Sequence, residues 1–196
     1  MTLYFHLDPI FIKPSHLQTT LTLFTHTVLF HRSMCLIRPK EMVDTIYYVK
    51  IDDDQLDQKT SVLIQHIVQN FSNHMYKNLD SYHIDICLSL CKSQKKDSWF
   101  GLKEEIVEFE NWKIPITVLS PIDKSFSVDE QVLFLKMVHQ IANLSENYLP
   151  LPLSILQHIS QLRIDLYQED KEDKKDSIFN SMMNLIKTGP AIPFSI

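Results

Sequence analysis

The shortage of glycine is the feature that most limits how this chain can fold and what it can bind. Its 196 residues include only two glycines, Gly101 and Gly189, where an average soluble protein of this length carries about fourteen. Phosphate-binding loops, dinucleotide-binding turns and nucleophile elbows need clustered glycines, because a side chain would block the tight turn or the approach of the ligand. The sequence therefore excludes these sites, whether codon usage or selection caused the shortage.

The overall composition predicts one soluble globular domain over residues 1–196. Hydrophobic residues make up 44% of the chain and charged residues 22%, a balance typical of chains that bury a core. The formal net charge of −5 argues against binding to duplex nucleic acid, where a basic surface supplies most of the affinity. We therefore expect no nucleic-acid partner.

Cysteine usage and hydropathy predict a cytoplasmic protein. The three cysteines form no Cys-x-x-Cys motif, and Cys87 and Cys91 lie about 13 Å apart in a predicted strand, too far for a disulfide. Such an unpaired set is typical of a reducing compartment. The N-terminal residues lack the basic flank and clean apolar run of a signal peptide. The longest apolar stretch, Leu17–Phe30, is too short to span a bilayer.

Hydrophobic periodicity predicts a mixed order of strands and helices, and hence an α+β domain. The clearest strand is Tyr82–Leu90, whose alternation predicts one buried and one polar face. Ser15 is expected to cap the first helix, and Pro115 predicts an edge position or a bulge for its strand. The other predicted strands are 3–7, 46–51, 112–118 and 162–166. Predicted helices span about 15–32, 128–143 and 176–187, and a further long helix after Asp52–Asp54 is marked by Ile64, Val68, Phe71 and Met75.

Two large aromatic residues interrupt a charged connection. Residues Lys92–Glu110 are expected to form a loop of the length that is usually functional or disordered, and Trp99 and Phe100 lie at its centre. The pair either folds back onto the domain or forms a projecting recognition tip, because aromatics on exposed turns bury much area with few torsions to freeze. Gly101 follows the pair directly, which predicts a tight turn with positive φ at that position.

The helix predicted at Val128–Asn143 has an unusually wide apolar face. At about 100° per residue its apolar side chains cover an arc of about 200°, roughly twice what a surface helix needs. Either the helix is wedged between the sheet and the C-terminal segment, or its outer flank binds a partner, since a large exposed apolar surface otherwise risks aggregation.

The chemically active residue types in the sequence favour structural roles. Among the nine histidines, His26 and His31 do not have the i, i+4 spacing of a helical zinc site. The carboxylates of Asp52–Asp54 are better explained as a helix N-terminus than as a cation site. No motif activates a serine or cysteine as a nucleophile. We therefore predict no catalytic residue, no metal and no cofactor.

Several segments resemble, in order and at similar spacing, a known family of autophagy proteins. The block His26–Ser33 is similar to the end of the first helix in the autophagy-related protein 101 family, and the resemblance is collinear from about residue 1 to residue 152. The shorter similar segments are Tyr47-Tyr48-Val49 and Gln55-Leu56-Asp57 at a strand and the following helix, Trp99-Phe100 at the family's aromatic finger, Trp112 at the next strand, and Tyr148-Leu149-Pro150 after the long helix.

The resemblance implies a HORMA-like fold, with a mainly antiparallel sheet packed against three long helices and a C-terminal segment at about 153–196. It also implies a non-enzymatic adaptor of the autophagy-initiating kinase complex, found in the cytoplasm and at the preautophagosomal structure when autophagy is induced. Members of the family form a heterodimer with the HORMA domain of autophagy-related protein 13 and stabilise it. The finger in loop 92–110, here Trp99 and Phe100 with Gly101 as its turn, recruits downstream autophagosome-formation factors.

The resemblance also implies a partner interface on the third long helix, since HORMA pairs of this type commonly meet there. By fold position, the interface residues are Leu133, Phe134, Met137 and Ile141. Two alternatives stay open beside the adaptor. One is a HORMA-like scaffold of another pathway, and the other is a small cytosolic enzyme that uses a histidine or cysteine site.

Overall fold

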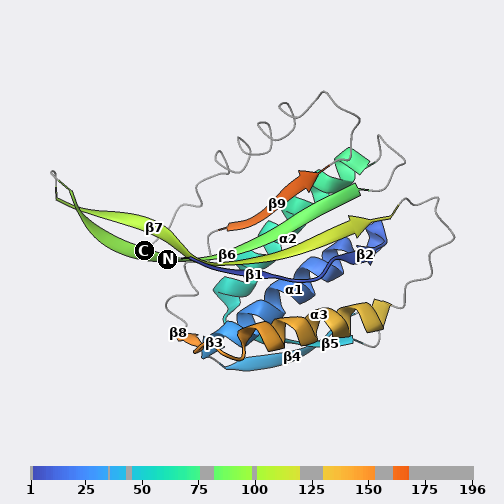
Figure 1. The fold of residues 1–196 in the computed structure, drawn as a ribbon, viewed down its shortest axis with the longest axis horizontal. Helices are drawn as coiled ribbons and strands as arrows, with labels where there is room; N and C mark the ends of the chain where they lie inside the picture. Colours follow the sequence, from blue (N-terminus) through green and yellow to red (C-terminus); the bar gives the residue numbers. More distant parts are fainter. Residues whose placement is uncertain are drawn as a thin grey trace.

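The computed structural model describes residues 2–34, 36–42, 46–75, 82–98, 101–119, 130–152 and 161–167. Within these ranges a sheet lies beside three helices, α1 (Leu17–Arg32), α2 (Asp54–Met75) and α3 (Glu130–Ser145) (Figure 1). The predicted mixture of a sheet with three helices is therefore confirmed. The helix predicted at 176–187, Gly189 and most of the C-terminal segment lie outside the described residues.

The main sheet is built on one long antiparallel pair, β6 (Tyr82–Ser98) and β7 (Gly101–Val118). β9 (Gln161–Tyr167) runs antiparallel along the other side of β6. β1 (Leu3–His6) and β2 (Ile10–Ile12) follow one another along β7 and run parallel to it. The strand order is thus β1-β7-β6-β9, with β2 also on β7. The sheet is mixed, because the two N-terminal strands depart from the antiparallel pattern.

Two further sheets have two strands each. β3 (Ser33–Met34) pairs in parallel with β8 (Leu151–Pro152), and β4 (Ile37–Met42) pairs antiparallel with β5 (Ile46–Ile51). β5 was predicted from its periodicity, but β4 was not. The sequence of β4, IRPKEM, has no apolar alternation, and its charges and proline are typical of an edge strand protected against further pairing.

Helix α1 is covered over most of its circumference. It contacts α2, α3 and β5, and the apolar residues that recur along it at helical spacing, Leu17, Leu21, Phe24 and Val28, are fully buried. Several polar residues are buried with it, among them Thr20, Thr25 and His26. The periodic stripe therefore underestimated the buried face, because neighbours pack against the helix from more than one side.

The start of α1 differs from the predicted one. Ser15 lies inside a short 3-10 turn, Pro14–His16, and His16 occupies the cap position of α1 without a capping side-chain hydrogen bond. The amide of His16 donates to the carbonyl of Lys13 at 3.0 Å, which closes the turn. Pro14 favours this geometry because its ring holds φ near the helical value. Ser15 therefore does not cap α1, which begins at Leu17 after the turn.

The alternation predicted for β6 describes the core face but not the opposite face. Ile86 and Leu88 are fully buried, as predicted. The prediction of a single buried face is wrong, because Cys87, Ser89 and Cys91 are buried as well. These side chains are small, and Asn111 Nδ2 donates to Ser89 Oγ at 3.0 Å. Burial on this face is tolerated because the hydroxyl keeps a hydrogen bond.

Pro115 lies in the interior of the sheet, not at the predicted edge or bulge. β7 has β6 on one side and β1 and β2 on the other. The carbonyl of Lys113 accepts a hydrogen bond from the amide of Leu7 at 2.9 Å, so the backbone of Lys113 faces the side of β1. Alternate residues along a strand face the same side, so the backbone of Pro115 faces that side as well. β1 pairs before Pro115 and β2 pairs after it. The missing N–H therefore faces the break between the two strands, where no ladder donor is needed.

The predicted loop at 92–110 is mostly a two-stranded hairpin, which we call the arm. The arm consists of Cys91–Ser98 of β6 and Gly101–Glu108 of β7, which pair in continuous register. β9 reaches β6 only as far as Ser89, and β1 begins opposite Glu110. Among the described residues the arm therefore has no third strand, and Figure 1 shows it projecting beyond the rest of the sheet. The charged sequence suits such a ribbon, because none of the described helices covers it.

A β-bulge marks the point where the arm leaves the sheet. Leu90 pairs with Glu110 and Cys91 pairs with Glu108, so Phe109 is an extra residue on β7. Bulges of this kind bend a strand and increase its local twist. The bulge therefore separates the three- and four-stranded part of the sheet from the arm.

A buried ion pair joins the end of α1 to β7. The side chain of Arg32 is 2% exposed and that of Glu110 is 1% exposed. Arg32 donates to the carboxylate from Nη2 at 2.5 Å and from Nε at 3.0 Å, a bidentate geometry that gives strong, oriented hydrogen bonds. The indole N–H of Trp112 donates to Glu110 Oε2 at 3.1 Å. Both carboxylate oxygens are therefore hydrogen-bonded.

The same guanidinium fixes the chain that follows α3. Arg32 Nη1 donates to the carbonyls of Tyr148 at 3.2 Å and Leu149 at 3.1 Å. The ring of Phe5 stacks on Trp112 with centroids 4.0 Å apart and meets the ring of Tyr148 edge-on at 5.0 Å. Helix α1, strands β1 and β7 and the segment after α3 thus meet at one buried cluster, which we call the polar centre.

Removing one partner of the ion pair is expected to be more harmful than replacing both. Glu110→Leu leaves the Arg32 guanidinium buried without its counter-charge, and we expect a loss of about 3–5 kcal/mol in the free energy of unfolding. Arg32→Met together with Glu110→Leu removes both charges, so the double variant should be more stable than Glu110→Leu alone. Urea denaturation followed by circular dichroism measures these values. A double variant less stable than Glu110→Leu would contradict the prediction.

The arm is expected to open more readily than the sheet from which it projects. A two-stranded hairpin is marginally stable by itself, whereas the part of β6 before the bulge has strands on both sides over residues 83–89. In hydrogen exchange measured by NMR, hydrogen-bonded amides of the arm should exchange at least about tenfold faster than those of residues 83–89. Equal protection on both sides of the bulge would show that the arm is not a separate opening unit.

Candidate functional site

The arm leads to the residues that sequence analysis assigns to the finger. Ser98 and Gly101 are the last register partners of the ladder, so only Trp99 and Phe100 stand between the two strands in the sequence. Trp99 and Phe100 themselves lie outside the described residues. Gly101 is the first residue of β7, and the positive φ expected there stays a prediction.

The two strands of the arm carry opposite charges. In the backbone register of the ladder, Lys95 pairs with Glu104 and Lys96 pairs with Lys103. The side chains of Lys95 and Ile106 are exposed. The charged residues are Lys92, Lys95, Lys96 and Asp97 on β6, and Lys103, Glu104, Glu105 and Glu108 on β7.

Helix α3 uses most of its predicted interface residues to fill the core of its own chain. Phe134, Met137 and Ile141 are fully buried, and Leu133 is partly buried against the same core. Their burial argues against these three side chains as surface contacts with a partner. The helix is wedged against α1, which accounts for one half of its wide apolar arc.

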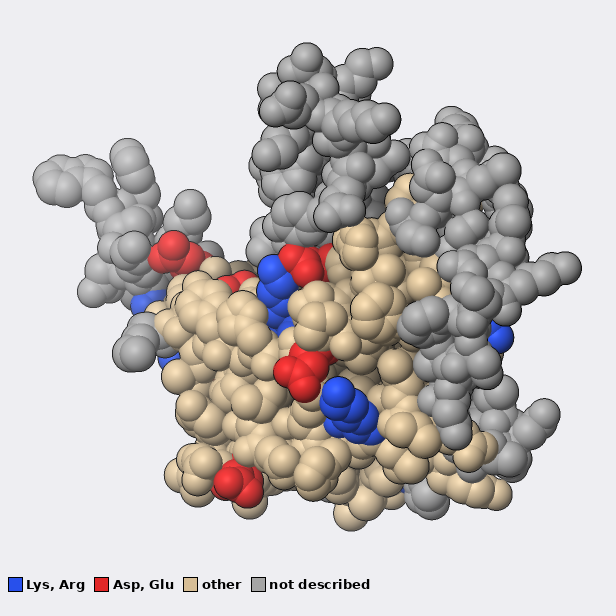
Figure 2. All heavy atoms as spheres, turned by 45° about the vertical axis from the view of Figure 1, so that its right-hand side comes forward, with Lys and Arg blue, Asp and Glu red and all other residues tan. Residues whose placement is uncertain are grey.

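The outer flank of α3 accounts for the other half of the arc. Val132 is 61% exposed and Leu135 is 69% exposed, and their i, i+3 spacing places them side by side on the helix. The described surface on the face drawn in Figure 2 carries few charged side chains. Val132 and Leu135 are not among the interface residues implied by the resemblance, because that assignment followed fold position and periodicity does not tell which edge of a wide stripe meets the core.

Polar contacts fix α3 against the N-terminal segment. Gln140 accepts a hydrogen bond from the amide of Asp8 at 3.2 Å and donates to the carboxylate of the same residue. Lys136 Nζ lies 3.9 Å from that carboxylate. These contacts join the helix to the connection between β1 and β2, and they leave the flank with Val132 and Leu135 exposed.

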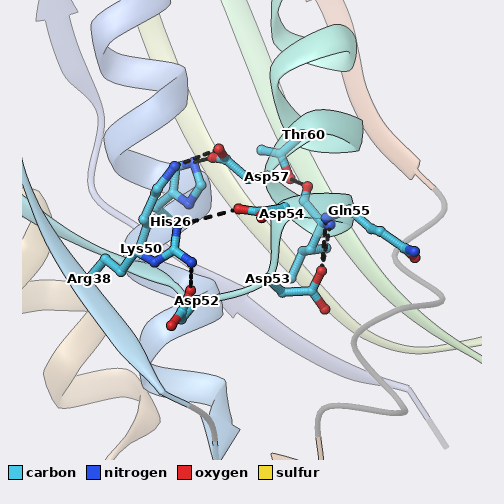
Figure 3. A network of polar contacts seen from close by, with 10 residues as sticks. His26, Arg38, Lys50, Asp52, Asp53, Asp54, Gln55, Asp57 and Thr60 are labelled. Atoms are coloured by element: carbon cyan, nitrogen blue, oxygen red, sulfur yellow. Dashed lines mark hydrogen bonds and ion pairs between the residues drawn. The ribbon is translucent and has the colours of Figure 1, made fainter.

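The aspartates before α2 have structural partners, shown in Figure 3. Asp53 Oδ1 accepts hydrogen bonds at 3.0 Å from two backbone amides of the first turn of α2, so it caps the helix. Asp52 and Asp54 both form ion pairs with Arg38 of β4. The interpretation of these carboxylates as a helix N-terminus is confirmed, and the aspartate pairs with Arg38 also attach β4 to α2.

A second polar cluster joins α1, β5 and α2 (Figure 3). Lys50 Nζ lies 2.5 Å from Asp57 Oδ2, and the buried His26 has its Nε2 3.8 Å from Asp57 Oδ1. The ring of Tyr48 lies 5.4 Å from that of His26. Burial, and next the charge of Asp57, raises the pKa of Tyr48 above its ordinary value of 10.0. His26, Tyr48 and Asp57 come from three of the segments that carry the resemblance, and the structure brings them together.

Among the described residues, the remaining candidate groups have no arrangement that indicates metal binding. Burial lowers the pKa of His31 below its ordinary value of 6.5, which favours the neutral ring. In the part of the chain that the structure describes, no three histidine, cysteine or acidic side chains are grouped so that they could hold a metal ion. No described helix is long and apolar enough to cross a membrane.

The residue that sequence reasoning missed is Glu110, around which the polar centre is built. The segments His31-Arg32-Ser33, Trp112 and Tyr148-Leu149 were singled out by the resemblance, but nothing indicated what holds them together. One signal was available, because Glu110 has the same parity along β7 as Trp112 and Ile114. A charged residue at an inward-facing strand position needs a buried partner, and Arg32 is that partner.

Comparisons with known proteins match most of the chain to one protein family. The family model described as Autophagy-related protein 101 matches residues 9–151, a range that runs from before β2 to the start of β8. A curated protein of Arabidopsis thaliana, Autophagy-related protein 101, is 30% identical over 114 residues, which cover 56% of this chain and 50% of that protein. The chain therefore spans about half the length of this relative. The match over residues 9–151 shows that the chain belongs to the autophagy-related protein 101 family.

Proposed function

We propose that the chain is a non-enzymatic adaptor of the autophagy-initiating kinase complex. The observation that carries this proposal is the family match over residues 9–151, which includes α1, the arm and α3. The adaptor holds the HORMA domain of autophagy-related protein 13 in a heterodimer and stabilises it. It recruits downstream autophagosome-formation factors with Trp99 and Phe100. Its place of action is the cytoplasm, and the preautophagosomal structure once autophagy is induced.

The shape of the arm supports a role of the finger in recruitment. The two strands that flank Trp99 and Phe100 in the sequence extend beyond β9 and β1, so the described end of the arm lies away from the main sheet. Two aromatic side chains that enter a groove bury enough apolar area to contribute several kcal/mol before the ordering costs are subtracted. The resulting contact is weak and reversible, as recruitment requires.

The exposed flank of α3 supports a partner interface on that helix. Val132 and Leu135 present adjacent apolar side chains, and large apolar side chains at the centre of an interface carry much of its binding energy. The core-facing residues Phe134, Met137 and Ile141 hold the helix in place. We therefore assign partner contact to the outer flank and packing to the inner one.

The finger is tested by replacing both aromatics together. Trp99→Ala with Phe100→Ala should leave the thermal midpoint within about 2 °C of the parent, because we propose that the pair contacts a partner and does not pack in the core. Binding of the autophagy-related protein 13 domain should persist, while co-precipitation of downstream factors is lost. Tyr47→Ala serves as the matched control, since Tyr47 is an exposed aromatic on β5, and it should retain recruitment. A double variant that unfolds would place the aromatics in the core.

The α3 interface is tested by a single charge. Leu135→Asp should raise the Kd for the HORMA domain of autophagy-related protein 13 at least about tenfold, because it buries a carboxylate in an apolar contact. Isothermal titration calorimetry measures the change. Val62→Asp introduces the same charge at an exposed position of α2 and should leave the Kd unchanged. Equal effects of the two variants, or none from either, would remove α3 from the interface.

A pull-down separates the adaptor from the two alternatives. Recovery of autophagy-related protein 13 and other components of the kinase complex with the intact chain supports the adaptor. Recovery of other partners without any autophagy component would favour a scaffold of another pathway. Retention of a small-molecule substrate and its turnover by the purified chain would favour an enzyme.

A further inference from the structure

The arm has an open strand edge that the proposed finger does not use. On the β9 side, pairing with β6 ends at Ser89, so no other described strand lies beside Cys91–Ser98. An open edge presents a row of backbone donors and acceptors that can pair with an added strand. On the β1 side, pairing begins only at Glu110, so the β7 strand of the arm has an open edge as well.

The hydrogen bonds of the sheet tell which backbone groups face each edge. Lys113 directs its carbonyl to β1, so Trp112, one residue away, faces β6, and its register partner Leu88 faces β7. The extra residue of the bulge lies on β7, so the alternation along β6 is unbroken. The backbone groups that face the open edge of β6 are therefore those of Cys91, Ser93, Lys95 and Asp97.

One independent contact supports this assignment. Glu108 is the register partner of Cys91 and should face the opposite open edge, away from β6. Its carbonyl accepts a hydrogen bond from Thr2 Oγ1 at 3.2 Å, and Thr2 precedes β1, on that same side. The edge of β7 is thus partly occupied by the N-terminal segment of the chain itself.

The charges of the two strands indicate which edge of the arm binds a partner and what kind of segment binds there. The β6 strand of the arm has three lysines and one aspartate, whereas the β7 strand has three glutamates and one lysine. Two copies joined through their β6 edges would place lysines beside lysines.

We propose that the β6 edge of the arm, Cys91–Ser98, binds an extended acidic segment of a partner protein, which adds to the arm as a further strand. Backbone groups of Ser93, Lys95 and Asp97 supply the strand hydrogen bonds. The lysines of the strand select acidic side chains. This edge is distinct from Trp99 and Phe100, and its occupancy stabilises the arm on which they are carried.

The test uses the full chain and a synthetic peptide of eight residues, acetyl-Glu-Val-Glu-Thr-Glu-Val-Glu-Thr-amide. With the peptide at about ten times its Kd, exchange of the outward amides of Ser93, Lys95 and Asp97 should slow about tenfold. The Kd should rise when sodium chloride is raised from about 50 to about 300 mM, because exposed charges are screened. The matched peptide with lysine in place of glutamate should not bind.

Two proline variants separate the β6 edge from a general effect on the arm. Lys95→Pro removes an outward donor of β6 and should weaken peptide binding at least about tenfold, since proline cannot donate to an added strand. Ile106→Pro removes an outward donor from the other edge, because Ile106 pairs with Ser93, and should keep the Kd within about twofold of the parent. Lys95→Gln keeps the donor, and a smaller loss with weaker salt dependence is expected. Circular dichroism verifies that each variant folds.

Several results would overturn the proposal. These are no amide protection at millimolar peptide, equal binding of the lysine peptide, or equal losses from Lys95→Pro and Ile106→Pro. Self-association of the chain in sedimentation, with the same amides protected, would identify a second copy as the occupant instead. Trp99→Ala with Phe100→Ala should still bind the peptide, so failure of the finger and failure of the edge are distinguishable.

Discussion

The buried pair of Arg32 and Glu110 is the interaction on which the rest of the structure depends. Removing two charges from water costs several kcal/mol for each ion. Here hydrogen bonds to all three guanidinium nitrogens and both carboxylate oxygens offset this cost. The carboxylate has the guanidinium and the indole of Trp112, and the guanidinium also holds two carbonyls after α3. The end of α1, the middle of β7 and the start of the C-terminal part of the chain are therefore held in one relative position.

The polar centre also explains how a marginal hairpin can project from a stable body. Glu110 is the register partner of Leu3, the first residue of β1, and of Leu90, the last residue before the bulge. The arm thus begins just beyond Glu110, a residue of β7 that buried hydrogen bonds hold in place. Beyond the bulge the described ladder has only two strands, so the change from the fully paired sheet to the two-stranded arm takes place within a few residues.

Periodicity predicted the elements whose apolar residues face one covered side. The strands around Ile84 and Ile114 and the helix with Leu21 and Phe24 were found in this way. The polar strand β4 and the charged arm were missed, because they are held without an apolar pattern by backbone pairing and, for β4, also by the ion pairs of Arg38. The pairing of Arg32 with Glu110, 78 residues apart, was also not predictable, since parity can show that a glutamate faces inward but not which cation meets it.

In the candidate site, too, periodicity could not tell which side chains face the core and which face solvent. The sequence shows that the apolar arc of α3 is wide, but only packing against α1 determines that Phe134 faces the core and Leu135 faces water. The ionised groups of the polar centre and of the Asp57 cluster pair with one another, so they satisfy the fold and do not face a ligand. The exposed flank of α3 and the open edge of the arm belong to separate elements that the polar centre holds apart. An adaptor that must keep one partner while it recruits another needs such a separation.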